Sequence, residues 1–119
     1  MSDEFLRAAK KEVSDDIAKI GILLQSCSDD NTLYENAARL EKHIHKIKGL
    51  APMMGHDQIG HVAALVDKLL KVVLAGGSVS GIYLATKKSY EFMQNEIDGA
   101  SQDFDLLKAE VEKITNLLR

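Results

Sequence analysis

Apolar residues recur along this chain at intervals of three and four, which is the spacing of one face of an α-helix. The pattern fills five segments, at about residues 3–27, 31–54, 57–75, 78–98 and 102–118, separated by capping residues or glycines. No strand pattern interrupts them. Short connections favour antiparallel neighbours, so we predict an all-α fold: an antiparallel up-and-down four-helix bundle with an additional C-terminal fifth helix, in a single domain over residues 1–119.

The second segment carries the most regular stripe, and Asn31 or Thr32 is expected to open it. Pro52 falls inside this stripe and cannot donate a hydrogen bond to the carbonyl of Lys48, so we expect a bend or local irregularity around residues 48–52 in a helix that continues to Met54. The alternative is a helix that ends near Leu50, with Pro52 opening a short turn. The stripe comprises Leu33, Ala37, Leu40, Ile44, Ile47, Ala51 and Met54.

His45 lies on the outer side of this predicted helix. At about 100° per residue it is about 120° from the centre of the stripe, and Gly49 lies beside it one turn later. Lys48 falls on the flank nearer the stripe, still within reach of the imidazole. Glycine costs about 1 kcal/mol against alanine in a helix, so its presence suggests that something must come close to His45.

A single solvent-facing histidine is usually an ordinary surface residue. An imidazole that accepts a phosphoryl group, however, needs an exposed ring nitrogen, a nearby cation for the phosphoryl oxygens, and space for a partner's active site. His45, Lys48 and Gly49 offer all three together. A metal site is not expected, because His43 and His45 point about 200° apart on a helix.

Composition narrows the classes of function. Apolar residues make up 45% of the chain and aromatic residues 5%, which suits close packing of helices. The net charge of −3 argues against nucleic acid binding, because no basic stripe is present to neutralise phosphates. The N-terminal sequence lacks the features of a secretory signal and no apolar run is long enough to span a bilayer, so we expect a cytoplasmic protein without membrane insertion.

The segment His45–Gly55, with the sequence His-Lys-Ile-Lys-Gly-Leu-Ala-Pro-Met-Met-Gly, resembles the phosphorylation motif of histidine-containing phosphotransfer (HPt) domains. In these domains His-x-x-Lys-Gly is followed six residues later by glycine. The Met-Gly ending and the helical segment after it are most similar to the N-terminal phosphoryl-accepting domain of CheA-type chemotaxis histidine kinases. The resemblance in motif covers about residues 40–74.

The resemblance implies a role for each site residue. His45 would accept the phosphoryl group through Nε2, Lys48 would contact the phosphoryl oxygens, and Gly49 would leave room for the docking domain. In CheA-like domains a glutamate on the next helix orients the histidine, and the corresponding position here is Asp67, whose side chain is one methylene shorter. The pattern also places a histidine where this chain has Ala64. The alternative for Asp67 is an exposed carboxylate paired with Lys71.

Two further lysines, Lys42 and Lys46, form a basic edge with Lys48. Such an edge is ordinarily a solvated face, but it could equally steer an acidic receiver pocket toward His45, and the sequence does not separate the two.

The resemblance implies that a histidine kinase catalytic domain phosphorylates His45 and that the receiver domain of a response regulator takes the group onto its aspartate, supplying Mg²⁺ itself. The chain has no glycine-rich phosphate loop and no acidic metal cluster, so we expect no intrinsic cofactor and no ATP site. It would be a phosphoryl carrier, either free-standing or the first domain of a longer kinase. The alternative is a helical adaptor that docks partner helices, with His45 incidental.

Overall fold

The computed structural model describes residues 2–118, and no strand occurs among them. The prediction of an all-α fold is therefore confirmed. The elements in chain order are α1 (Asp3–Gln25), α2 (Asp30–Glu35), α3 (Ala37–Leu50), a 3₁₀ turn η1 (Pro52–Met54), α4 (Asp57–Leu74), α5 (Ile82–Ile97) and α6 (Phe104–Asn116).

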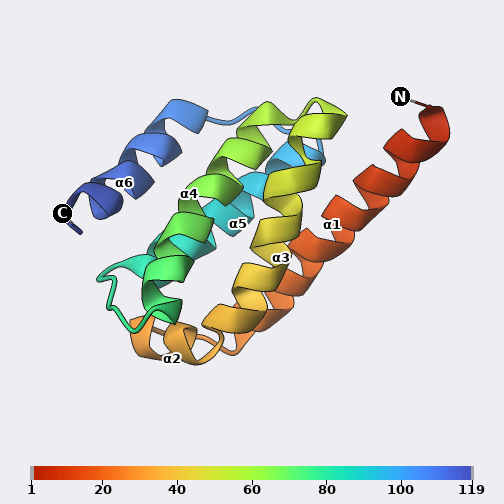
Figure 1. The fold of residues 1–119 in the computed structure, drawn as a ribbon. Coiled ribbons are helices and arrows are strands. Elements are labelled where there is room, and N and C mark those ends of the chain that lie inside the picture. Colours follow the sequence, from red (N-terminus) through yellow and green to blue (C-terminus); the bar gives the residue numbers. More distant parts are fainter. Residues whose placement is uncertain (1, 119) are drawn as a thin grey trace.

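Four long helices, α1, α3, α4 and α5, form the bundle (Figure 1). Successive members run in opposite directions, and α5 closes the bundle by packing against α1 as well as α4. The contact between α3 and α4 is the most extensive. The additional C-terminal helix, α6, packs on the outside against α4 and α5. In Figure 1, α4 therefore lies between α6 and α3.

Each helix turns its apolar stripe inward, and the stripes meet in one continuous core. Because the core holds almost no aromatic side chains, aliphatic residues fill it and the helices approach closely. None of the helices in the described part of the chain is long and apolar enough to cross a membrane. The largest fully buried side chains are Val13, Ile17, Ile20, Leu33, Leu40, Ile44, Ile47, Ile59, Leu69, Leu70, Ile82 and Met93.

The second predicted segment is two helices, so the expectation of one continuous helix is wrong. The helix is interrupted at Asn36, which lies between α2 and α3. Asp29 rather than Asn31 or Thr32 caps α2, because its carboxylate accepts from the backbone N–H of Thr32 while the Thr32 hydroxyl accepts from that of Asp29. Long-range contacts hold α2 in place: both oxygens of Asp30 accept backbone N–H groups at the start of α5.

The predicted bend at Pro52 within a helix to Met54 is also wrong, and the alternative is confirmed. α3 ends at Leu50, and Pro52 opens the 3₁₀ turn η1. The missing N–H of proline stops the α-helical hydrogen bonding, while a tighter turn accepts proline at its first position. Gly55, with φ of 85°, ends the turn and lets the chain reverse into α4.

The proline ring sets the spacing of η1 against α4. A Cβ atom at Gly60 would lie 2.5 Å from Cγ of Pro52, closer than van der Waals contact allows. We expect Gly60→Ala to lower the free energy of unfolding by a net amount of about 1 kcal/mol, because overpacking costs about 1–3 kcal/mol and the gain in helix propensity returns up to about 1. Urea unfolding would measure this.

Gly49→Ala is the matched control, because a Cβ atom there would meet nothing within 4 Å. Its stability should stay level or rise. Equal stability of the Gly60→Ala variant and the wild type would contradict the close approach of η1 and α4.

Candidate functional site

His45 and Gly49 lie on the outer side of α3, and Lys48 lies on the flank nearer the buried stripe, where it reaches Asp67 on α4. The His45 side chain is 62% exposed and the Lys48 side chain 41% exposed. Gly49 is exposed, and the space where its side chain would stand is open. The helix therefore presents an imidazole and an ammonium group beside a stretch of bare backbone.

Asp67, on α4, is the residue that ties α4 to this face of α3. Its Oδ2 accepts from Nζ of Lys48 at 3.2 Å and forms an ion pair with Nζ of Lys71 at 2.9 Å. The predicted pairing with Lys71 is present, but the carboxylate is buried rather than exposed. It lies in the contact between α3 and α4, which is the most extensive helix contact of the bundle.

Glu41 is a site residue that the sequence reasoning missed. It lies one turn before His45 on α3, and its Oε1 is 3.8 Å from Nδ1 of His45. The only sequence signal was the spacing of four, which places two helical side chains on one face. Glu41 also approaches Asp67, so that donor atoms of Glu41, His45 and Asp67 all lie within 4.8 Å of one another.

The spacing of these three groups alone would suit a metal ion. Two ammonium groups, however, already neutralise the Asp67 carboxylate through its Oδ2. A cation placed between the carboxylates would be repelled by both lysines at short range. We therefore interpret the cluster of Glu41, His45 and Asp67 as a hydrogen-bonding network.

The two carboxyl groups differ in their affinity for protons. A hydrogen bond with Asp67, together with burial, raises the pKa of Glu41 above its ordinary value. Burial alone would raise the pKa of Asp67, but hydrogen bonds with Lys71, Glu41 and Lys48 together lower it. Asp67 is thus the ionised member of the pair, and Glu41 is the member that takes up a proton more readily.

The two lysines of the predicted basic edge differ in their surroundings. Lys46 turns toward α1, where it pairs with Glu12 and with Asp16, the latter at 3.4 Å. Lys42 is exposed and lines a cavity of about 330 Å³ between α1 and α3. His43 lies on this α1 side, with Nδ1 2.8 Å from Oδ1 of Asp16, so it does not join His45.

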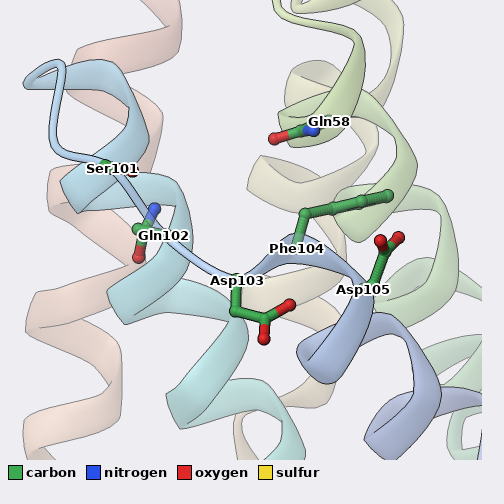
Figure 2. Close-up of a pocket in the computed structure, with 6 residues that line it drawn as sticks. All are labelled: Gln58, Ser101, Gln102, Asp103, Phe104 and Asp105. Carbon is green, nitrogen blue, oxygen red and sulfur yellow. The ribbon is translucent and has the colours of Figure 1, made fainter.

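Another cavity lies away from His45, where the loop before α6 meets the start of α4 (Figure 2). It measures about 490 Å³ and is lined by Gln58 and residues 101–105. Its charged side chains are the carboxylates of Asp103 and Asp105, which would repel a phosphoryl group. His45 is instead exposed on the outer side of α3, which suits a reaction completed by a partner's active site.

An exposed imidazole beside an ammonium group, with open space one turn away, can accept a phosphoryl group from a docked protein. Comparison with known proteins agrees with this chemistry. The family model described as Hpt domain matches residues 4–116, whereas no curated protein and no solved structure matches the chain. Hpt domains carry phosphoryl groups on histidine in phosphorelays and interact with kinases and response regulators. Since the match covers nearly all of the 119 residues, the chain belongs to the Hpt domain family.

Proposed function

We propose that this Hpt domain accepts a phosphoryl group on His45 and passes it to the aspartate of a response-regulator receiver domain. The single observation that carries the proposal is the 62% exposure of the His45 side chain on the bare side of α3, beside Lys48. At this exposure, the ring is accessible to two different partners in turn, which a relay requires.

Each site residue has a distinct task in the proposal. His45 is the phosphoacceptor through Nε2, which lies across the ring from the Nδ1 atom that faces Glu41. Lys48 contacts the phosphoryl oxygens, and its ion pair with buried Asp67 keeps the ammonium group near the ring. Asp67 orients the histidine through this network, and Gly49 lets the partner approach.

Lys42 and Lys46 are the residues that we assign to steering an acidic receiver pocket toward His45. The charge of Lys42 can act on a partner, because Lys42 is exposed and forms no ion pair with any of the described residues. Lys46 contributes less field to a partner, since Glu12 and Asp16 on α1 offset its charge.

The partners supply what the carrier lacks. A histidine kinase catalytic domain delivers the phosphoryl group from ATP, and the receiver supplies the Mg²⁺ that neutralises charge on the phosphoryl oxygens. The Asp67 carboxylate would hold Mg²⁺ poorly, because Lys48 and Lys71 occupy it. We place the relay in the cytoplasm and, from the His45–Gly55 motif, in a CheA-type chemotaxis pathway, with residues 1–119 acting as one domain.

The proposal is tested by following the phosphoryl group. Incubation with a histidine kinase catalytic domain and labelled ATP should give a label that is labile in acid and stable in base, the signature of phosphohistidine. Addition of a receiver domain with Mg²⁺ should then move the label to the receiver. Absence of label from the wild-type domain with a panel of such kinases would contradict the proposal.

A helical adaptor that docks partner helices is less well supported. It requires apolar helix surface left free, yet α6 buries its Leu107 and Val111 against the bundle. The adaptor also gives no reason for an open glycine beside an exposed histidine.

A further inference from the structure

We propose that Glu41 is the positioning residue that holds the proton on Nδ1 of His45, and that Asp67 acts on Glu41 rather than directly on the imidazole. This inference rests on the proposed function, since it concerns how His45 is prepared to take the phosphoryl group. The residue that orients His45 would then lie on α3, the helix that carries the histidine, and not on α4.

The geometry favours Glu41 as the direct partner. Its Oε1 lies 3.8 Å from Nδ1 of His45, and both residues are on one helical face because they are four apart. A hydrogen bond of about 2.9 Å needs a movement of about 1 Å, which rotation of two side chains provides. Glu41 is only 20% exposed, so it is held more firmly than the histidine that it faces.

Asp67 is engaged by lysines rather than by the imidazole of His45. Its Oδ2 binds the ammonium groups of Lys48 and Lys71. Its Oδ1 is buried and accepts no hydrogen bond from any fixed donor among the described residues. A buried acceptor of this kind needs a donor, and a proton on Glu41 supplies one. The raised pKa of Glu41, caused first by its hydrogen bond with Asp67, supports this arrangement.

One carboxyl group can then serve both neighbours. The hydroxyl oxygen of protonated Glu41 donates to Oδ1 of Asp67, while its carbonyl oxygen accepts from Nδ1–H of His45. The ring nitrogen that carries the proton is set by the hydrogen bond that the other one makes. Glu41 therefore favours the tautomer in which Nε2 has its lone pair free toward solvent.

This tautomer is the one that the transfer needs. The Nε2 lone pair attacks phosphorus, the Nε2–P bond forms, and the P–O bond to the leaving ADP breaks with its electron pair on oxygen. Nδ1 keeps its proton, so positive charge develops on the ring. The oxygen of Glu41 that faces Nδ1 stabilises this charge, as an orienting carboxyl does for other reactive imidazoles.

The test is ¹⁵N NMR of His45, which reads the tautomer without any phosphoryl transfer. We expect the wild-type protein to hold mostly the Nδ1–H form and Glu41→Ala to shift the ring toward the Nε2–H form. Phosphorylation of Glu41→Ala by a kinase domain should fall by about 10- to 100-fold, the effect of losing a partner that orients a reactive imidazole. Glu41→Gln should retain the tautomer and most of the rate, because its amide oxygen accepts from Nδ1–H and its amide N–H donates to Asp67.

Glu91→Ala is the matched control, since Glu91 is exposed on α5. An unchanged tautomer in Glu41→Ala, or a shift in Asp67→Ala alone, would overturn the inference. The proposed function can fail separately. If no histidine is labelled but Glu41→Ala still changes the tautomer of His45, then Glu41 does contact His45 and the phosphoryl-transfer function is wrong.

Discussion

Replacement of His45 by glutamine is expected to abolish phosphoryl labelling of the protein by a kinase catalytic domain. The amide of glutamine has no nucleophilic lone pair on nitrogen, so nothing at this position can attack phosphorus. The fold should persist, because the side chain is 62% exposed. We expect the free energy of unfolding to change by no more than about 0.5 kcal/mol, as for other surface substitutions.

His61→Gln is the control for this experiment. His61 is exposed on α4, with its ring edge-on to Phe104 and outside the network of Glu41, His45 and Asp67. Its variant should be labelled like the wild type. Full labelling of His45→Gln would move the phosphoacceptor to another histidine and end the assignment made here.

The outward direction of His45 was predictable because a helix rotates by a fixed angle per residue. Once the buried stripe is recognised, every other position on that helix has a known direction. Leu40, Ile44 and Ile47 are fully buried, as the stripe requires, and His45 lies exposed beyond them. The open space at Gly49 follows from the same counting.

The break at Asn36 was not predictable in this way. The apolar positions Leu33, Ala37 and Leu40 keep their phase across it, so the pattern contains no interruption. What separates α2 from α3 is the attachment of α2 to distant residues, including the bonds from Asp30 to the start of α5. Contacts between segments so far apart in sequence leave no local signal.

The role of Glu41 was hidden for a related reason. Glutamate is an ordinary residue on an exposed helical face, and nothing in its immediate sequence distinguishes it. Its importance appears only when Asp67 from α4 is placed beside it. Likewise, the burial of Asp67 depends on how closely α4 approaches α3, which periodicity does not specify.

Replacement of Gly49 by leucine should separate docking from chemistry. A Cβ atom at Gly49 would meet nothing within 4 Å, and position 49 is exposed, so we expect leucine to be accepted there while it removes a glycine from the last turn of α3. Stability in urea should stay level or rise by up to about 1 kcal/mol. Transfer between His45 and a kinase or receiver domain should fall by about a hundredfold, because displacing the docked partner by about 1 Å costs that much in rate.

Two comparisons make the Gly49→Leu result specific. Ala109→Leu adds the same side chain at an exposed position on α6, which packs against α4 and α5, so its transfer rates should match the wild type. Phosphoramidate, a small phosphoryl donor, reaches His45 without a docked protein and should label Gly49→Leu at close to the wild-type rate. Equal losses with phosphoramidate and with protein partners would mean that leucine disturbs His45 itself. In that case Gly49 supports the imidazole and does not serve as the opening for a partner.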